Sequence, residues 1–464
     1  MKILYCQVHR FRKAFFYVTH KSMGSTSGKL ARQIVDELCA AGHSAYLVGG
    51  CVRDELLGIE PKDYDVATSA RPDEVLRLFP KAELVGAHFG VMLVRGEGHQ
   101  VEVATYRSDG AYEDGRHPGA VTFESEPECD ARRRDFTINA LFRDPSSGQV
   151  LDFVGGQKDL REGVVRAIGN PRERFEEDHL RMLRAVRFAA RFRYRIEKET
   201  YTAMGELAPL IHRVSAERIR DELLRILTEG NARAGFELLD GCGLLKEVLP
   251  EVHAFRGVEQ PPEFHPEGDV WTHVMMMLEQ MGTATPSLAL GVLLHDVGKP
   301  PTFRVAERIR FDGHVEVGVE MARGILSRLR CSKELSARVC ELVAHHMRFK
   351  DVHRMKASTL KRFLRMDGFE EHLALHRLDC LSSNRQLENY EFARRMWESM
   401  PEEALRPPRL LTGEDLIAAG YEPSPMFSRM LRAVEDAQLE GRASTRQEAL
   451  RVAMAVAEQG VERS

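Results

Sequence analysis

The chain has few cysteines and no arrangement of them that would hold zinc. Its 464 residues include eight cysteines, which are scattered without any Cys-x-x-Cys pair. Zinc ribbons need closely spaced cysteine pairs and disulfide frameworks are dense in cysteine, so both classes are excluded. Scattered free thiols are typical of a reducing compartment, and we expect a cytoplasmic protein.

Long apolar runs and a strong overall charge are also missing. No apolar stretch approaches the roughly 20 residues of a membrane span, so we expect no membrane partner. The formal net charge is −4, with 66 Lys and Arg against 70 Asp and Glu, so any contact with nucleic acid must be local. Local basic density does exist where six arginines crowd one segment: Arg181, Arg184, Arg187, Arg191, Arg193 and Arg195.

The pattern of the chain changes from mixed to helical along its length, which suggests about three domains. Strand-like runs alternate with short helices at first, a polar stretch (108–128) predicts a mobile loop, and the pattern is helical from residue 163 onward. This order predicts an α/β head with a mixed sheet, followed by an all-α body and a further helical domain. The expected divisions are a disordered extension (1–24), the head (25–160), a neck and body (161–255), the further helical domain (256–400) and a helical tail (401–464).

A strand, a glycine turn and a helix start follow one another near the beginning of the head. The apolar run of residues 45–48 predicts a buried strand, and Gly49 and Gly50 end it before a helix begins. Glycine lets the backbone approach an anion, and the free N–H groups of a helix start point at it. The turn therefore predicts a phosphate cradle in which Arg53 donates its fork to a phosphate oxygen.

Two aspartates follow this turn. Asp63 leads into an apolar strand that contains Asp65, and side chains two residues apart on a strand point to the same face. Two carboxylates on one face beside a triphosphate cradle can hold Mg²⁺ for nucleotidyl transfer.

These motifs, in this order, resemble the signature of the polymerase-beta-like nucleotidyltransferases, and most closely the bacterial CCA-adding enzyme and poly(A) polymerase family. Residues 132–141 (RRRDFTINAL) are similar to that family's Arg-Arg-Asp-Phe-Thr-Ile-Asn-Ala-Leu motif. Residues 177–181 (EDHLR) are similar to its base-selecting Glu-Asp-x-x-Arg helix. The resemblance covers roughly residues 45–250 and implies the head of a class II tRNA nucleotidyltransferase.

The resemblance implies roles for two further residues of the head. The family places its third acidic residue on a strand equivalent to the one around Glu102, and we carry that catalytic role to Glu102. Val101 and Val103 would lie on the opposite face of this strand, which leaves Glu102 alone on its side. Arg134 resembles the family's nucleotide-contacting arginine.

A helix expected from Asp178 onward carries a row of charges on one face. Asp178 and Arg181, one turn apart, place a hydrogen-bond acceptor beside a donor. Cytosine and adenine offer an amino donor next to a ring-nitrogen acceptor, whereas uracil and guanine offer the reverse pattern. The pair is therefore expected to select C and A, with Arg184 and Arg187 reaching the triphosphate or the ribose.

A second candidate metal site lies in the further helical domain, where an apolar segment ends in His295-Asp296. This segment resembles the core of the HD phosphohydrolase superfamily, which implies a divalent metal held by four ligands, with additional histidines in an extended site. The four matching residues are His273, His295, Asp296 and Asp379, and the extension is His314 with one of His345 or His346. Imidazole beside carboxylate suits Mn, Ni, Co, Fe or Zn. Such domains serve as phosphodiesterases or phosphatases in some family members and as scaffolds in others, and both uses stay open.

The best interpretation is an enzyme that adds C and A to the 3′ end of tRNA from CTP and ATP, without a nucleic-acid template and with Mg²⁺ in the head. The segment 85–90 (VGAHFG) lacks the basic Arg-Arg-Phe typical of poly(A) polymerases, and an intact loop over residues 107–123 favours competence for A. An A-adding or CC-adding specialist, a poly(A) polymerase, and a metal-dependent phosphohydrolase with a degenerate RNA-binding head are the alternatives. The oligomeric state is open.

Overall fold

The structure is a computed structural model that describes residues 26–85, 90–110 and 119–461. It divides into two compact units, Met1–His253 and Ala254–Ser464. The expected N-terminal extension, residues 1–24, lies outside the described residues. The finer divisions at residues 160 and 400 stay predictions.

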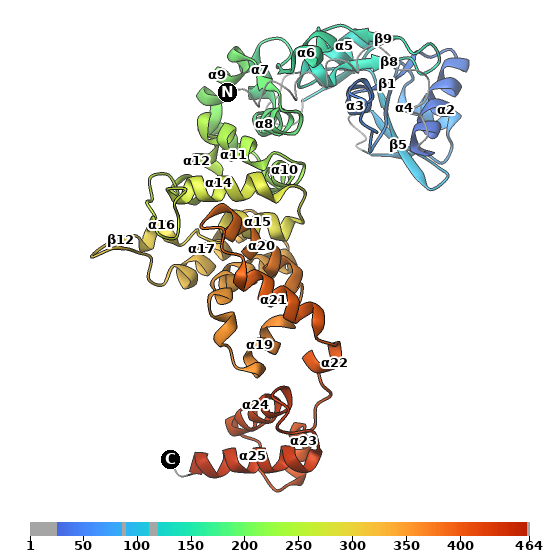
Figure 1. The fold of residues 1–464 in the computed structure, drawn as a ribbon. Coiled ribbons are helices and arrows are strands. Elements are labelled where there is room, and N and C mark those ends of the chain that lie inside the picture. Colours follow the sequence, from blue (N-terminus) through green and yellow to red (C-terminus); the bar gives the residue numbers. More distant parts are fainter. Residues whose placement is uncertain (1–25, 86–89, 111–118, 462–464) are drawn as a thin grey trace. The chain divides into compact units, whose positions relative to one another are not determined.

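A seven-stranded mixed sheet forms the head, as the sequence predicts (Figure 1). The strand order is β3-β4-β5-β2-β1-β8-β9. β2 and β5 run parallel, and the other neighbouring strands run antiparallel. The strands are β1 (Ala45–Val48), β2 (Asp65–Thr68), β3 (Glu83–Leu84), β4 (Val91–Gly96), β5 (His99–Thr105), β8 (Leu141–Arg143) and β9 (Val150–Asp152).

The burial pattern of β5 explains why its residues form a strand with one face toward the core. Val101, Val103 and Thr105 are buried, whereas Glu102 between them is exposed. This is the period-two alternation of a half-buried strand. The helices of the head are α2 (Thr26–Ala40), which packs on β1 and β5, α3 (Gly50–Leu56), α4 (Pro72–Leu78), α5 (Pro127–Arg132) and α6 (Gly156–Glu162).

The polar stretch expected as a mobile loop is partly regular structure. β6 (Arg107–Asp109) pairs antiparallel with β7 (Val121–Phe123), and α5 begins at Pro127. The expectation was wrong for these flanks because Val121 and Phe123, which favour strands, were outweighed by their polar neighbours. Residues 111–118, at the centre of the stretch, lie outside the described residues.

Helices dominate the rest of the first unit, with one small exception. β10 (Val164–Val165) and β11 (Arg195–Ile196) form a short parallel pair that the helical pattern does not predict. The helices are α7 (Pro171–Glu177), α8 (Leu180–Phe192), α9 (Lys198–Leu207), α10 (Ala216–Thr228), α11 (Ala232–Gly241), α12 (Leu244–Val248) and α13 (Pro250–His253), with the 3₁₀ segment η3 (Ala208–Arg213).

The second unit is helical apart from one hairpin of β12 (Arg304–Val305) and β13 (Ile309–Arg310). Its first group of helices is α14 (Val270–Met281), α15 (Pro286–Leu294), α16 (Lys299–Thr302), α17 (His314–Arg328), α18 (Lys333–His345), η4 (His346–Arg354), α19 (Ala357–Leu364), α20 (Phe369–Ser382) and α21 (Glu388–Ser399). The tail follows with α22 (Glu402–Leu405), α23 (Gly413–Ala418), α24 (Pro425–Leu439) and α25 (Arg446–Val461). No helix in the described ranges is long and apolar enough to cross a membrane.

Candidate active site and metal centre

The glycine turn after β1 brings three predicted site residues to one place. Gly49 has φ of 79°, a left-handed conformation that favours glycine. A Cβ at Gly49 would lie 3.3 Å from Nη1 of Arg134 and 4.0 Å from Oδ2 of Asp65. Gly50, the next residue, begins α3. The turn, the arginine and the aspartate therefore converge, and the space above Gly49 is already bounded by a cation and a carboxylate.

Three carboxylates lie on or just before the strands beside this turn. Asp65 on β2 lies directly opposite Glu102 on β5 in the parallel register. Burial raises the pKa of Asp65 to about 6, with further contributions from the charges of Glu102 and Asp63, while Arg134 opposes the rise. Asp63 lies in a bend before β2 rather than within it, so strand alternation does not orient it as expected.

The composition of this cluster fits a hard divalent cation. Its donors are carboxylate oxygens, which Mg²⁺ prefers, and their mutual repulsion adds to burial in raising the pKa of Asp65. A bound cation would remove that repulsion. Asp63, Asp65 and Glu102 are the residues that would hold it.

Arg134 is held toward the cluster by a buried aspartate that the sequence reasoning missed. Nη2 and Nε of Arg134 donate to Oδ2 of Asp130 at 2.8 and 3.1 Å. Arg133 donates to the other oxygen of Asp130 through Nε at 2.8 Å. Burial alone would raise the pKa of Asp130, but the two arginines outweigh it and lower that pKa. Asp130 is four residues before Arg134 at the end of a helix, so an i, i+4 search would have found it.

Arg53 is buried beside the glycine turn, where its Nη2 lies 3.6 Å from the position of a Cβ at Gly50, and its role as a phosphate donor stays a prediction. Its Nε and Nη2 donate to Oδ1 of Asp54 at 2.8 and 2.7 Å, and Nη1 donates to Asn139. The guanidinium lies over the rings of Phe188 and Phe192, 5.1 and 4.7 Å from their centres. The residue is 3% exposed. Asp54 balances its charge, and the guanidinium connects α3 to the two phenylalanines of α8.

Asp178 does not lie on the helix that the sequence predicts for it. It ends α7 in an extended conformation, and α8 begins two residues later at Leu180. Its Oδ1 accepts the backbone N–H of Leu180 at 3.1 Å, which explains why the chain breaks here, because aspartate favours such capping bonds. Its two oxygens also pair with Arg218 on α10, at 3.2 and 2.8 Å.

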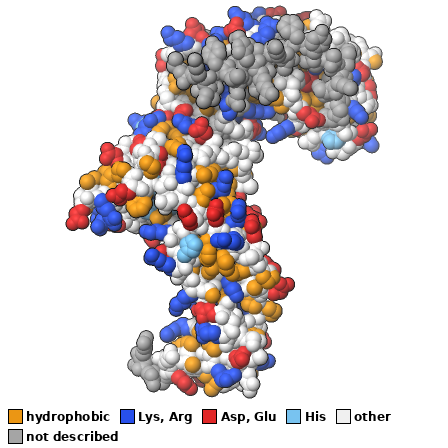
Figure 2. Space-filling model, viewed as in Figure 1, with side chains coloured by type: hydrophobic (Ala, Val, Ile, Leu, Met, Phe, Trp, Pro, Cys, Tyr) orange, Lys and Arg blue, Asp and Glu red, His pale blue; other side chains and the backbone are white. Residues whose placement is uncertain are grey.

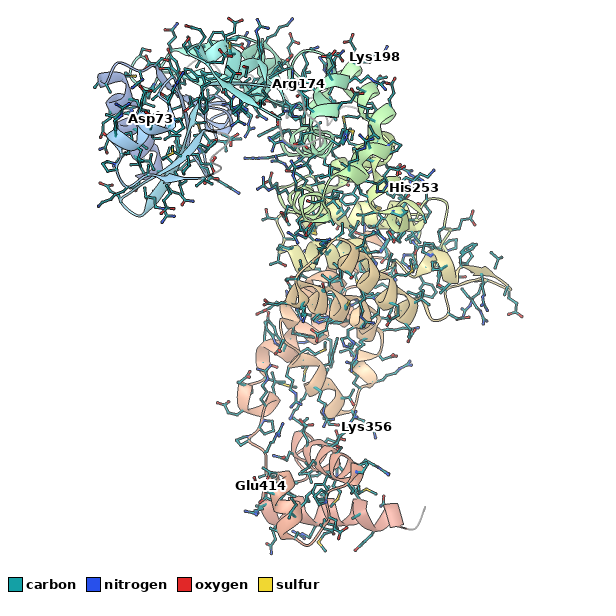
Figure 3. All side chains as sticks on the ribbon, turned by 180° about the vertical axis from the view of Figure 1, so that it is seen from behind. Asp73, Arg174, Lys198, His253, Lys356 and Glu414 are labelled. Carbon is teal, nitrogen blue, oxygen red and sulfur yellow. The ribbon has the colours of Figure 1, made fainter. Side chains whose placement is uncertain are left out.

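Arg181 has partners other than Asp178, so the two residues do not form an ion pair with each other, and their joint selection of the base stays a prediction. Nη1 of Arg181 donates to Glu177 at 2.5 Å and to the carbonyl of Arg174, a residue labelled in Figure 3, at 2.9 Å. Asp178 and Arg181 remain close in sequence at the junction of α7 and α8, but each is neutralised separately.

The two arginines further along α8 also meet acidic partners. Arg184 donates to Oδ2 of Asp135 from Nη2 at 2.6 Å and from Nε at 2.8 Å, and a third of its side chain is exposed. Arg187 is buried and donates to Glu222 at 2.6 Å. Arg184 thus contacts the Arg-Asp-Phe motif through Asp135, whereas Glu222 holds Arg187 in the interior of the first unit, and the expected contact of Arg187 with a triphosphate stays a prediction.

In the second unit the predicted histidines and aspartates form one buried cluster. Nε2 of His273 lies 3.2 Å from Asp379, and Nε2 of His295 lies 3.1 Å from Asp296. His314 and His346 point their Nε2 atoms at the other oxygen of Asp296, at 3.9 and 3.7 Å. Two sets of three side chains each bring their ligand atoms within 4.8 Å of one another: His273, His295 and Asp379, and Asp296, His314 and His346.

Backbone hydrogen bonds orient three of these imidazoles. Nδ1 of His295, His314 and His346 lies 2.9, 2.9 and 2.7 Å from the carbonyl oxygens of residues 292, 311 and 343. Because a carbonyl oxygen only accepts hydrogen bonds, each Nδ1 donates and carries the proton of the neutral ring. The Nε2 atom then has a lone pair that points at the cluster. Within the described residues, no hydrogen bond reaches Nε2 of His314 or His346. Buried nitrogen lone pairs without donors fit a transition-metal ion.

Of the two candidate histidines His345 and His346, His346 is the one that lies in the cluster. His345 packs instead against His372, with 6.0 Å between the ring centres. Both of these residues have lowered pKa values, chiefly because they are buried. His345 therefore lies outside the cluster.

Four residues that support the cluster were missed in the sequence. Glu267 accepts from Nδ1 of His273 at 2.7 Å, and His265 reaches the same carboxylate at 2.9 Å. Lys299 Nζ lies 2.7 Å from Asp296 and donates to Gln260 at 2.6 Å. The sequence could have indicated Lys299, because it follows Asp296 by three residues. Glu267 and His265 lie in an irregular loop, where no periodic pattern indicates them.

Comparisons with known proteins match three separate parts of the chain. A poly A polymerase head domain matches residues 45–166, a probable RNA- and SrmB-binding site of polymerase A matches residues 193–256, and an HD domain matches residues 269–374. The CCA-adding enzyme of Enterococcus faecalis is 40% identical over 257 residues, which are 54% of this chain and 63% of that protein. That of Oceanobacillus iheyensis is 46% identical over 196 residues, 42% of this chain and 49% of that protein.

Solved structures extend the similarity along the chain. The Bacillus stearothermophilus CCA-adding enzyme in complex with CTP is 26% identical, with a TM-score of 0.71 over 95% of this chain and 99% of that one. A Thermotoga maritima CCA-adding enzyme complexed with tRNA shares the fold at 21% identity, with a TM-score of 0.58 over 94% of this chain and 96% of that one.

The fold and the two clusters define a nucleotidyltransferase head joined to an HD-type helical domain. The chain therefore carries a head domain of the poly A polymerase type and an HD domain, and it is similar to CCA-adding enzymes. In sequence it spans about half to two thirds of the length of the curated relatives that it matches.

Proposed function

We propose that this protein adds C and A to the 3′ end of tRNA, with CTP and ATP as donors. The observation that carries the proposal is the meeting of Asp65, Glu102 and Arg134 beside the turn at Gly49. In the reaction, the tRNA 3′ oxygen forms a bond to the α-phosphorus of the nucleotide. The bond from that phosphorus to the β-phosphate oxygen breaks, pyrophosphate leaves and the hydroxyl proton passes to solvent.

The head residues have distinct roles in this proposal. The backbone at Gly49 and Gly50 lets the triphosphate approach, and the Nη1 of Arg134 faces it from the side that Asp130 leaves free. Asp63, Asp65 and Glu102 would hold Mg²⁺, which lowers the pKa of the attacking hydroxyl and stabilises the leaving pyrophosphate.

Base selection is proposed for Asp178 and Arg181, and it requires both to exchange partners. Asp178 would release Arg218 and accept from the amino group of C or A, and Arg181 would release Glu177 and donate to the neighbouring ring nitrogen. Arg184, which is partly exposed, is placed to contact the triphosphate or the ribose.

The test is addition to tRNA transcripts that end before CCA, after C and after CC, with each labelled nucleotide supplied separately. The proposal expects C, C and A in order, followed by arrest. A alone on the transcript ending in CC would identify an A-adding specialist, C without A would identify a CC-adding enzyme, and long A tails would identify a poly(A) polymerase. No addition to any transcript would overturn the proposal.

We propose a second activity for the helical domain, the hydrolysis of phosphate esters with a bound transition metal among Mn, Ni, Co, Fe and Zn. The supporting observation is the set of imidazole lone pairs that converge on Asp296. Metal-loaded protein should contain a transition metal by elemental analysis, and the double change His295→Ala and Asp296→Ala should remove it while tRNA addition survives. Absence of bound metal after loading with each ion would overturn this proposal.

A further inference from the structure

The hairpin of β12 and β13 projects from the second unit between α16 and α17 (Figures 1 and 3). Its exposed side chains include Arg304, Arg308 and Arg310. Val305 at its end is 70% exposed. Figure 2 shows Lys and Arg side chains among apolar and acidic ones on this projecting part. We call residues 303–311 the arm.

In the part of the chain that the structure describes, no carboxylate balances the positive charges of the arm. Arg304 and Arg310 are direct cross-strand partners, and like charges placed opposite each other destabilise a hairpin. Within the described residues, neither these arginines nor Arg308 forms an ion pair with a carboxylate. The acidic residues of this region, Glu307 at the turn and Asp312 after β13, do not form one with them either. An anion from outside would relieve the repulsion.

The base of the arm contacts residues of the histidine cluster. Phe303 and Phe311 pack together at its base, with 5.9 Å between ring centres. The ring of Phe311 faces Nζ of Lys299 at 5.4 Å, and its carbonyl oxygen accepts from Nδ1 of His314 at 2.9 Å. Lys299 and His314 both approach Asp296. The arginines therefore begin beside the residues proposed to hold a metal.

From this placement we propose that the arm binds the backbone phosphates of an RNA 3′ end whose terminal phosphate enters the histidine cluster. The inference rests on the proposed hydrolase activity and names its substrate class. Guanidinium forks match phosphate oxygens. Arg308 precedes Arg310 by two residues and lies in the turn, so it is separated by up to about 7 Å of chain from the paired Arg304 and Arg310. A single phosphate would leave one end of the arm empty, so an oligonucleotide fits better than a mononucleotide.

In the hydrolysis that the arm would serve, the oxygen of a water molecule forms a bond to the terminal phosphorus. The bond from that phosphorus to the ribose 3′ oxygen breaks. One water proton ends on that oxygen, and inorganic phosphate and an RNA 3′-hydroxyl leave.

The kinetic test uses full-length protein loaded with Ni²⁺ and two substrates, a short oligoribonucleotide with a 3′ phosphate and p-nitrophenyl phosphate. For the triple change R304A, R308A and R310A, KM for the oligonucleotide should rise about 10- to 100-fold, because charged hydrogen bonds are lost. Its kcat, and both constants for p-nitrophenyl phosphate, should stay within about twofold because the cluster itself is untouched. The matched control K333A, R354A and K356A removes three exposed cations from the same unit and should change neither substrate. Equal KM values for the oligonucleotide in the triple variant and wild type would overturn the proposal.

A second measurement needs no activity. An oligonucleotide with 4-thiouridine near its 3′ phosphate, irradiated with metal-free protein, should crosslink to a peptide from the arm. Crosslinks confined to other peptides would overturn the proposal. A lack of hydrolysis with both substrates would refute only the hydrolase activity. The triple variant should also melt no lower than wild type, because it loses a like-charged pair. A clear fall in Tm would assign the arginines a structural role instead.

Discussion

The two candidate metal sites are built in opposite ways. In the head, carboxylates project from the neighbouring strands β2 and β5, and their mutual repulsion helps raise the pKa of Asp65. In the helical domain, backbone carbonyls hold the imidazoles so that their lone pairs converge in a buried space. The head therefore depends on the charge of an incoming ion, whereas the helical domain orients its ligands before any ion arrives. The first arrangement suits a cation that enters with each nucleotide, and the second suits a resident one.

The largest effect should come from Asp65, the carboxylate of the head cluster whose pKa burial and neighbouring charges raise. Asp65→Ala should lower nucleotide addition by at least about 100-fold, because charge stabilisation at the reacting phosphate is lost. Binding of tRNA should stay nearly intact. Asp73→Ala, which removes an exposed carboxylate on α4, is the control. Single-turnover addition within tenfold of wild type would show that the ions bind elsewhere in the head.

Because the helical domain orients its ligands before an ion binds, one added methyl group beside them should weaken metal binding. A Cβ at Gly298 would lie 2.1 Å from the carbonyl oxygen of His314 and 2.7 Å from the backbone nitrogen of Gly318. Gly298→Ala must push α17 and His314 away from Asp296, so metal affinity should fall by about 10- to 100-fold. Gly324→Ala, where nothing lies within 4 Å, is the matched control. Metal titration of both variants decides, and equal affinities would show that the ligands adapt to the ion.

Base selection should depend on Asp178 less steeply than catalysis depends on Asp65. Asp178→Ala removes the acceptor for the amino group of C and A, and each mismatched buried hydrogen bond costs about 1–3 kcal/mol. Discrimination against UTP and GTP should therefore fall by roughly one to two orders of magnitude. Asp221→Ala removes an exposed carboxylate from α10 and should leave selection unchanged. If Asp178→Ala and Arg181→Ala both keep wild-type ratios among the four nucleotides, this junction only joins helices.

The smallest effect concerns pH and the head's internal ion pairs. Burial alone would raise the pKa of Asp135, but Arg184 outweighs it and lowers that pKa to about 2. A lowered carboxyl pKa contributes stability that is present at neutral pH and is lost as the pH falls from about 4 toward 2. The contribution should be about 1–2 kcal/mol. Urea unfolding of wild type and Asp135→Asn between pH 6 and 3 should show a gap that narrows with acidity, and a constant gap would contradict the assignment.

Patterns that depend on local periodicity were the most predictable from the sequence. The run of residues 45–48 is β1 in the structure, and the apolar alternation around Glu102 predicted the exposed side of β5 correctly. The HD-like motif and its spaced partners likewise indicated the cluster, because His295-Asp296 directly follows the apolar run that forms α15.

Partners far apart in the sequence were the least predictable. Asp178 was expected on a helix with Arg181 because charges three residues apart usually share a face, but its capping bond to Leu180 and its pairing with Arg218 break that helix. Arg53 lies beside the turn as expected, but its hydrogen bond to Asn139 and its contact with the ring of Phe188 were not predicted. These contacts are made with residues that are distant in the sequence, and a local sequence pattern cannot identify such partners.

The pairing of β2 with β5 also determines where this chain can accept insertions and deletions. Asp65 faces Glu102 through the backbone ladder, and β5 takes its register from β4 across the tight turn at Glu97 and Gly98. Deleting one residue within β5 before Glu102 would exchange the two faces of the strand, so that a valine replaced the glutamate beside Asp65. Extra residues at the turn itself would leave the ladder in place. Natural length variation should therefore collect at the turn and be absent from the strand.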